Sequence, residues 1–277
     1  MKLTLISHFY NEEFLLPYWI RHYIDIVDEA IMIDYHSNDS SLDIIRSLAP
    51  HWKIIKSRNE YFDTEEIDKE VMDIESSISD WKMTLNTTEF LLKKNLKEYL
   101  FEFETIAPGF GAISTNGIWM VDNEITKDEK LDNKPLVLQK RRGFFEQEKL
   151  PFFIHPRKPF FLSEPSRSRL IHNKKNGQYE PGRHKFNVPH FKDKNLLLLW
   201  FGYSPFSFIK QRKLNIYKKK SKEFINQVKK LKGEDYFTAM VSITEEDIDE
   251  KFVHFSSMSD DLTKNSIYNK ELQLFNI

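Results

Sequence analysis

The first third of the chain alternates between short apolar runs and segments with helical periodicity, and this alternation constrains the fold most strongly. The apolar runs lie at residues 3–7, 30–34, 52–57 and 81–86. They are short, rich in Ile, Leu and Met, and bounded by polar residues, which is typical of buried parallel strands. Strands that alternate with helices predict an α/β fold with a doubly wound, mostly parallel sheet and right-handed crossovers.

The segments between these runs carry apolar residues at helical spacing. They are Leu15, Trp19, Tyr23 and Ile26 after the first run, and Ile67, Val71, Ile74 and Ile78 after the third. Pro17 is suited to a first helical turn, so the first helix is expected to begin near Leu16. Asp63 and Glu66 have the spacing of a capping box and predict the start of the third helix. Residues 42–48 predict a shorter helix between these two.

Beyond residue 90 the sequence predicts fewer regular elements. We expect a helix over 92–100, a loop over 108–117, exposed charged residues over 127–134, strands at 152–154 and 160–162, a long loop over 172–190, and a buried strand at 196–200. Ser204 and Pro205 have the order of a helix start, and residues 224–231 predict an amphipathic helix. The chain is thus expected to form an α/β domain over 1–203 and a helical, basic extension over 204–277.

The composition excludes several classes of protein. Lys and Arg number 41 and Asp and Glu number 42, so the net charge is −1, whereas a general nucleic-acid binder needs a clear positive excess. Cysteine is absent, which excludes disulfides, Cys-zinc sites, iron–sulfur clusters and thiol catalysis. The longest apolar run, residues 196–201, is too short to span a membrane, and the first residues turn polar too soon for a signal peptide. We therefore expect a cytoplasmic protein.

Polar residues follow each predicted strand, at the edge where open parallel sheets bind ligands. They are His8, Asn11 and Glu12 after the first strand; Asp34, Ser37, Asn38 and Asp39 after the second; Arg58 and Asn59 after the third; and Asn86, Thr87, Thr88 and Glu89 after the fourth. Taken singly, several of them fit helix caps or turns. Gathered at one edge, they predict a polar cleft suited to the base, ribose and phosphates of a nucleotide.

Three segments of this region resemble a known enzyme family. Ile-Ser-His-Phe-Tyr-Asn-Glu-Glu at 6–13, followed by Leu-Pro-Tyr-Trp-Ile-Arg-His-Tyr at 16–23, is similar to the opening of family-2-like glycosyltransferases with the GT-A fold, in the branch with Asn-Glu and then Trp. Residues 33–41 resemble the family's Asp-x-x-Ser-x-Asp-x-Thr segment, and residues 81–91 its Trp-x-x-x-x-Asp-x-Asp-Glu-Phe-Leu segment. Residues 198–210 resemble a later family segment more weakly, so the resemblance mainly covers residues 3–92.

The resemblance implies a hexosyltransferase-type enzyme that moves a sugar from a nucleotide-diphospho-sugar, commonly a UDP-sugar, to a glycan or glycolipid acceptor in surface polysaccharide synthesis. By position, Asp34 would contact the uracil or ribose, and Asp39 would lie near the ribose. Asn11 and Glu12 would line the base pocket. The candidate donor-binding residues are Asn11, Glu12, Asp34, Ser37, Asp39, Arg58, Asn86, Thr88, Glu89 and His172.

The family's metal-binding motif is altered in this chain. Its Asp-x-Asp binds Mn²⁺ or Mg²⁺, which neutralises the diphosphate leaving group, but Asn86 and Thr88 stand at those positions. Divalent cations of this kind favour carboxylate oxygens, and Glu89 is one residue out of register. No metal site is therefore predicted, and we expect a metal-independent transfer in which a cationic side chain meets the phosphate charge. The candidates are Arg58, Arg141, Arg142 and the cluster Arg183-His184-Lys185.

An inverting transferase also needs a general base that deprotonates the acceptor hydroxyl. Glu146 and Glu164 are the candidates, with Glu180 behind them, and an ordinary surface acid is the alternative for each. The histidines of the long polar loop, His172, His184 and His190, do not have the spacing of a compact zinc motif. Two interpretations of these histidines stay open. They contact the diphosphate or the acceptor, with His172 as the first candidate, or they are exposed to solvent.

A Lys-rich segment over residues 210–232 holds ten Lys or Arg against one acid, Glu223. It predicts either a solvated helix face or a surface attracted to acidic glycans or anionic lipid headgroups, which would place the protein at the inner face of a membrane. Two other functions stay open. A nucleotidyltransferase would need a Gly-rich phosphate loop where His8-Phe9-Tyr10 stands. A non-catalytic nucleotide- or glycan-binding homologue of a glycosyltransferase would tolerate the altered metal motif.

Overall fold

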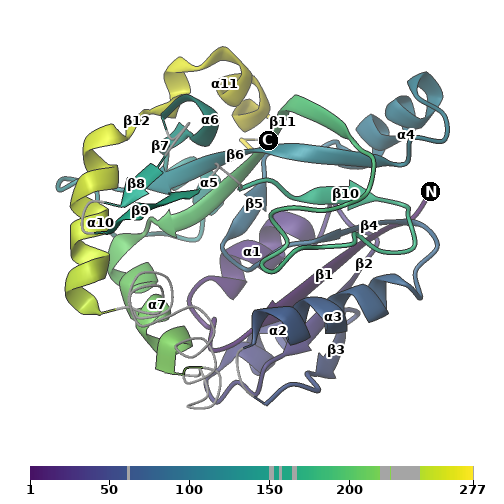
Figure 1. Ribbon diagram of the computed structural model, residues 1–277, viewed down its shortest axis with the longest axis horizontal. Coiled ribbons are helices and arrows are strands. Elements are labelled where there is room, and N and C mark those ends of the chain that lie inside the picture. Colours follow the sequence, from purple (N-terminus) through teal and green to yellow (C-terminus); the bar gives the residue numbers. More distant parts are fainter. Residues whose placement is uncertain are drawn as a thin grey trace.

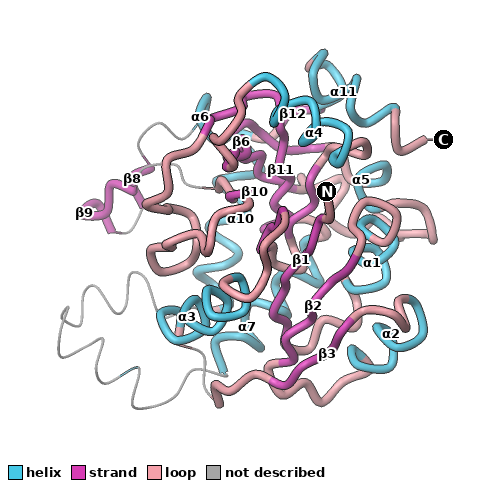
Figure 2. The backbone as a smooth tube through the Cα atoms, turned by 90° about the vertical axis from the view of Figure 1, so that its right-hand side faces the viewer, coloured by secondary structure: helices cyan, strands magenta, loops and turns pink. Residues whose placement is uncertain are grey.

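The computed structural model describes residues 1–60, 63–149, 153–155, 158–163, 167–218, 225 and 244–276 (Figure 1). The four predicted strands form one half of the central sheet as β1 (Leu3–Phe9), β2 (Glu29–Asp34), β3 (Lys53–Lys56) and β4 (Trp81–Thr84). These strands are parallel and lie in the order β3-β2-β1-β4, and Figure 2 shows the first three of them side by side. The predicted α/β class is confirmed.

Helices cover both faces of this parallel half. They are α1 (Leu16–Tyr23), α2 (Ser41–Leu48) and α3 (Thr64–Glu75). Successive side chains of β1 point to opposite faces of the sheet. Leu5 packs in the main core together with residues of α1 and α2, whereas Ile6 packs with Val71 of α3. The sheet is therefore doubly wound in this half, as predicted.

The helix starts follow the signals read from the sequence. Pro17 lies in the first turn of α1, where its missing N–H removes no helical hydrogen bond. Asp63 caps α3, because its side chain accepts hydrogen bonds from the backbone N–H groups of Glu65 and Glu66. These two local signals correctly predicted where the chain turns back across the sheet.

The other half of the sheet is mostly antiparallel. It contains β5 (Glu89–Leu91), β6 (Ala112–Val121), β7 (Arg142–Phe145), β10 (Leu170–His172), β11 (Phe191–Tyr203) and β12 (Asp260–Asp261). The order continues from β4 as β10-β6-β7-β12, while β11 pairs in parallel with β6 and antiparallel with β5. The short strands β8 (Phe153–His155) and β9 (Lys158–Ser163) pair with each other in a separate sheet.

Two elements differ from the sequence-based prediction. The loop predicted over 108–117 is wrong from residue 112 onward, since Ile113 and Ile118 are fully buried in β6. Gly, Ser and Thr favour turns locally, but β6 gains pairing with β7, β10 and β11, and this tertiary pairing overrides the local preference. The helix predicted over 92–100 begins later, as α4 (Leu96–Ile106), because Leu91 belongs to β5.

The chain after residue 203 packs onto the same sheet. α7 (Phe206–Lys218) starts directly after Ser204 and Pro205, and it is followed by α10 (Glu245–Met258) and α11 (Ser266–Gln273). β12 pairs with β7, and Tyr268 and Leu272 lie in the main core. The short helices α5 (Leu136–Gln139), α6 (Glu146–Lys149) and η1 (Leu262–Lys264) complete the described elements.

The division at residue 203 stays a prediction. Apart from Ile225, the helix predicted over 224–231 lies outside the described residues, as does the part of the Lys-rich segment after Lys218. Among the helices that the structure describes, none has the length and apolar character needed to cross a membrane.

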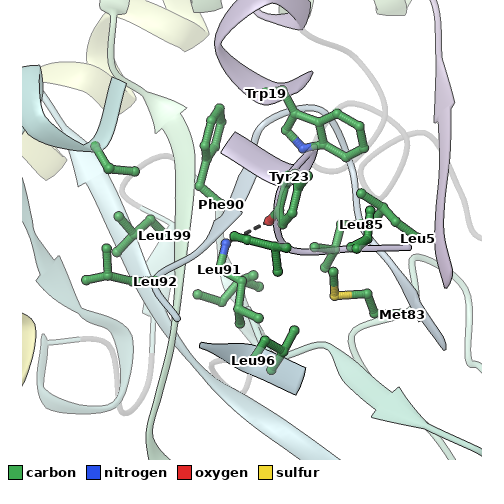
Figure 3. Packing of buried hydrophobic residues seen from close by; sticks show 14 of the residues in the cluster. Leu5, Trp19, Tyr23, Met83, Leu85, Phe90, Leu91, Leu92, Leu96 and Leu199 are labelled. Atoms are coloured by element: carbon green, nitrogen blue, oxygen red, sulfur yellow. Dashed lines mark hydrogen bonds between the residues drawn. The ribbon is translucent and has the colours of Figure 1, made fainter. Parts of the chain in front are cut away.

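Helix α1 fixes the position of β5 through buried side chains (Figure 3). The Tyr23 hydroxyl accepts a hydrogen bond from the Leu91 N–H at 2.7 Å and donates one to the Glu89 carbonyl at 3.0 Å. The Trp19 indole N–H donates to the same carbonyl at 3.1 Å. The backbone that carries Glu89 is therefore held by α1 from within the core.

Replacing Tyr23 by Phe is expected to lower the free energy of unfolding by about 1–3 kcal/mol, because the buried Leu91 N–H loses its partner. Urea denaturation measures this change. Tyr18→Phe is the matched control, since Tyr18 lies on the same helix, is partly exposed and should change stability by less than about 0.5 kcal/mol. A Y23F protein as stable as the parent would contradict the expectation.

Candidate functional site

A cavity of about 280 Å³ lies at the carboxyl ends of β1, β2 and β4. Its wall combines aromatic and apolar side chains with charged and polar ones: Phe9, Tyr10, Tyr35 and Ile67 on the one hand, and His8, Glu12, Asp68, Asn86, Arg183, His184 and Arg212 on the other. These residues come from the ends of the three strands, from α3, from the loop after β10 and from α7. The cavity thus lies at the sheet edge where the sequence predicts a polar cleft.

Arg183 is the central cation of this wall. It is 3% exposed, and its Nη1 forms an ion pair with Asp68 of α3. Its Nη2 donates to the Asn86 Oδ1 at 2.9 Å, and its Nε has no hydrogen-bond partner. The backbone of Arg183 has a φ of 57°, in the left-handed region that non-glycine residues seldom adopt. Because such conformations cluster at functional sites, Arg183 is a candidate ligand-binding residue.

Glu89 and Arg169 form a buried ion pair behind Asn86. Both are 1% exposed, and Arg169 donates to the two carboxylate oxygens of Glu89 at 2.6 and 2.9 Å. The Asn86 N–H donates to the same carboxylate at 2.8 Å. Burial alone would raise the pKa of Glu89, but Arg169 and these hydrogen bonds hold that pKa below the usual carboxyl range. Glu89 is therefore a structural anion that orients Asn86.

Asn86, Thr88 and Glu89 do not fit a divalent cation. Asn86 Oδ1 already accepts from Arg183, and both oxygens of Glu89 are bound by Arg169. Thr88 is buried, and its carbonyl accepts from the Phe201 N–H. Within the described ranges, no group of three or more His, Asp or Glu side chains has a metal-binding arrangement. A hard cation would need carboxylate oxygens that are free to coordinate it.

Two histidines of the wall are held neutral. Burial, with Arg183 next, lowers the pKa of His8 well below its ordinary value. Burial, with Arg169 and Arg167 next, lowers the pKa of His184 in the same way. The ring of His184 lies between two guanidinium groups, with Nδ1 2.8 Å from Arg169 and Nε2 2.9 Å from Arg167. These rings therefore add no positive charge of their own near neutral pH.

Helix α7 reaches the site through an ion pair with the first loop. Arg212 Nε donates to the Glu12 Oε1 at 2.6 Å, and the Glu12 side chain is 2% exposed. Burial raises the pKa of Glu12, although Arg212 opposes the shift. This contact closes the side of the cavity that faces the carboxyl-terminal part of the chain.

The other residues predicted after β1 and β2 mainly bind one another. Asn11 and Asn38 exchange hydrogen bonds at 2.7 and 2.9 Å, and the Asn11 N–H donates to the Ser37 hydroxyl. Asp34 is buried and accepts from the Ser37 N–H, while Asp39 accepts from the Glu13 N–H. Asn11 and Asp39 border a second, open cavity of about 630 Å³ on the other side of the Glu12–Arg212 pair.

Two predicted donor-binding residues lie away from the cavity. Arg58 forms an exposed ion pair with Asp73 on α3. His172 is completely buried against Glu75, 3.4 Å away, where the Tyr179 hydroxyl also binds. Neither residue lines the cavity, because the neighbouring helix α3 supplies each with a carboxylate partner. The sequence predicts His172 to begin the long polar loop, but this residue ends strand β10.

The structure also shows where a candidate base and the other candidate cations lie. Glu146 is buried, and its carboxylate accepts from the Trp119 indole N–H at 3.1 Å and the Arg167 backbone N–H at 2.6 Å. It lies behind the wall, because Arg167 separates it from His184. Glu164 lies outside the described residues. Arg141 and Arg142 donate to the backbone carbonyls of Leu138 and Ser259, and His190 contacts the Val188 carbonyl.

Three residues of the site, Asp68, Arg169 and Arg212, were missed by sequence reasoning. Asp68 carried no signal, since neighbouring residues of a helix point in different directions and Asp68 lies off the apolar stripe that contains Ile67. Arg169 lies just before a short buried strand, and Arg212 lies in a Lys-rich helix. Their partners come from more than 75 residues away in sequence, so no local pattern pointed to them.

No protein-family model matches the chain, and no curated protein matches its sequence. Solved structures with a similar fold include residues 1–349 of S. aureus TarS, with 10% identity, a TM-score of 0.40, and coverage of 100% of this chain and 91% of that one. The longer TarS structure has the same identity and score, and this chain spans 46% of its length. Glucosyl-3-phosphoglycerate synthase from Mycobacterium tuberculosis, in complex with Mn²⁺, UDP and glucosyl-3-phosphoglycerate, has 12% identity, a TM-score of 0.39, and coverage of 71% and 70%.

Proposed function

We propose that the cavity binds a nucleotide-diphospho-sugar, most simply a UDP-sugar, and that the chain transfers its sugar to an acceptor without a divalent cation. The observation that carries this proposal is the position of Arg183, which donates to Asn86 at the place where the family resemblance puts a metal ligand. In this proposal the guanidinium takes over the role of the metal.

The chemistry of the leaving group supports a cation at this point. Negative charge grows on the diphosphate as the glycosidic bond breaks, and preorganised donors lower the barrier by meeting that charge. Arg183 and Arg212 both line the cavity, so their guanidinium groups can meet that charge. Asp68 and Asn86 hold the guanidinium of Arg183 in place, so it need not reorganise during the reaction.

The apolar part of the wall suits the nucleoside. Tyr10, Tyr35 and Ile67 give flat or apolar surfaces against which a base can pack. Asp34 lies buried directly before Tyr35, at the end of β2, where it fixes the turn that presents the tyrosine. The predicted contact of Asp34 with the base or ribose remains part of the proposal.

Glu146 is the described candidate for the general base. It lies one side chain behind the wall, and its carboxylate accepts hydrogen bonds from Trp119 and Arg167. To accept a proton from an acceptor hydroxyl, the carboxylate must exchange one of these partners for the acceptor. The acceptor is proposed to be a glycan or a lipid-linked glycan, in keeping with the resemblance.

A non-catalytic nucleotide-binding protein is the second candidate function. The acids of the cavity wall favour this function. Glu12 and Asp68 line the cavity, but both are already paired with arginines, so neither carboxylate is free to act as a base. Such a cavity could bind a nucleotide-sugar and leave it intact. Release of free nucleotide from the donor separates the two functions.

The test is a thermal-shift series with UDP, GDP, dTDP, CMP and the matching nucleotide-sugars, each with Mn²⁺ and with EDTA. A ligand at a hundred times its Kd adds about 2.7 kcal/mol to stability, so we expect a clear rise in Tm with one nucleotide, equal in EDTA. A rise that requires Mn²⁺ would contradict metal independence. A rise without nucleotide release from any donor would select the non-catalytic function, and no rise with any nucleotide would contradict both.

A further inference from the structure

Five cations gather at and beside the cavity, and they differ in how their charge is balanced. Arg169 pairs with Glu89, Arg183 with Asp68, and Arg212 with Glu12. In the part of the chain that the structure describes, the remaining two, Arg167 and Lys213, have no carboxylate in ion-pair contact. They lie on aromatic rings instead.

The geometry brings these two cations to one place. The Arg167 guanidinium lies 3.7 Å from the centre of the Trp200 ring. The Lys213 ammonium lies 5.3 Å from the same ring and 4.5 Å from the ring of Tyr203. Gly202 permits this arrangement, because a Cβ there would come within 2.4 Å of Trp200 ring carbons. Arg167 and Lys213 thus both contact the Trp200 ring.

The rings cannot balance these charges alone. Contact with an aromatic face attracts a cation less strongly than a carboxylate does at the same burial. Burial, with Arg167 and Arg212 next, lowers the pKa of Lys213 well below its ordinary value, so its charged form lacks a counter-ion. Both residues are partly exposed. Glu146 and Glu89 favour the charged form of Arg167 without an ion-pair contact. Within the described residues, an anion in direct contact is therefore the partner that both cations lack.

This pair of cations is distinct from the proposed diphosphate position. Arg167 and Lys213 are not among the residues that line the cavity. Arg167 lies behind His184, which it contacts at 2.9 Å, and Lys213 follows Arg212 on α7. The backbone N–H of Arg167 binds Glu146, the candidate base. An anion held here would therefore lie beside the cavity, next to that carboxylate.

We propose that Arg167 and Lys213 form a subsite for an anionic group, a phosphate or a carboxylate, on the second substrate. The proposal rests on the proposed function, because it makes the acceptor an anionic molecule. The two cations would bind its anionic group and so place an acceptor hydroxyl between the donor cavity and Glu146. A neutral acceptor would bring no counter-charge into contact with either cation.

The experiment measures binding of glucose 6-phosphate, glucuronate and glucose to the full chain by calorimetry, at fixed ionic strength, with and without saturating UDP. We expect at least one anionic sugar to bind roughly tenfold or more tightly than glucose, with UDP present or absent. Whichever of the two binds more tightly identifies the group as a phosphate or a carboxylate. Equal binding of all three sugars overturns the proposal.

Lys213→Gln is expected to weaken the anionic sugar roughly tenfold and to leave the binding of UDP unchanged. Lys210→Gln is the matched control, because Lys210 lies on the same helix but pairs with Asp249 and Glu245 at 2.8 Å. Arg167→Lys keeps the charge and should retain most of the binding that Arg167→Gln loses. Unchanged binding in K213Q, or displacement of the anionic sugar by UDP, overturns the proposal. A protein that binds the anionic sugar through Lys213 but never binds a nucleotide would refute the proposed function alone.

Discussion

Replacing Arg169 by Met is expected to lower the free energy of unfolding by about 3–5 kcal/mol, the largest stability change predicted for this chain. The substitution leaves the carboxylate of Glu89, which is 1% exposed, without its counter-ion. It also removes the hydrogen bond from Arg169 to the Gly182 carbonyl, which holds the loop that carries Arg183. Urea denaturation, with equal slopes for both proteins, measures the loss.

The paired variant separates the charge effect from packing. Arg169→Met combined with Glu89→Leu should recover most of the stability, because no buried charge remains unpaired. Glu89→Gln gives a pH signature. Since the pKa of Glu89 lies below the usual carboxyl range, the parent's advantage over E89Q is full at neutral pH and shrinks as the pH falls through that lowered pKa. An R169M protein within about 1 kcal/mol of the parent would show that the pair contributes little.

Replacing Arg183 by Lys is expected to lower the turnover of the nucleotide-sugar by about 10²–10³-fold, the largest functional change predicted. Lys keeps the charge but loses the planar guanidinium that contacts Asp68 and Asn86 at the same time. The measurement is the rate of free nucleotide release from the donor selected in the thermal-shift series. Addition of Mn²⁺ should not restore the rate.

Two controls protect this result from a trivial loss of folding. Arg183→Met combined with Asp68→Asn removes both partners of the pair, so it should stay folded and yet bind the nucleotide poorly. Arg46→Gln alters an exposed arginine whose partner is the exposed Asp43, and it should leave turnover unchanged. If R183K turned over the donor at the parent rate, the proposed role of Arg183 would be refuted.

Much of the parallel half of the fold was predictable, because each signal is local. The apolar run at β1 and the cap at Asp63 act within a few residues of chain. The same locality explains the errors. β6 carries Gly, Ser and Thr, which favour a loop in isolation, and only its pairing with three other strands makes it a strand.

The candidate site was predictable as a region and only partly as a set of residues. Asn86 and the Arg183 cluster were identified because they stand at a strand end and in a polar loop, and both line the cavity. His172 and Arg58 had the same appearance in sequence but found carboxylates on α3 instead. A polar residue at a strand end can line the cavity or pair with a side chain of a helix. The outcome depends on partners that are distant in the chain.

The alternation of strands and helices, and thereby the sheet edge at which polar residues collect, follows from the amino-acid order, since hydrophobic periodicity is a property of neighbouring residues. The balance of charges at that edge depends on the folded structure. Folding paired Arg169 with Glu89, Arg183 with Asp68 and Arg212 with Glu12, across separations of 80, 115 and 200 residues. It also left Arg167 and Lys213 on aromatic rings. The free energy of a buried charge depends on its nearest counter-ion in space, and sequence order alone does not specify that neighbour.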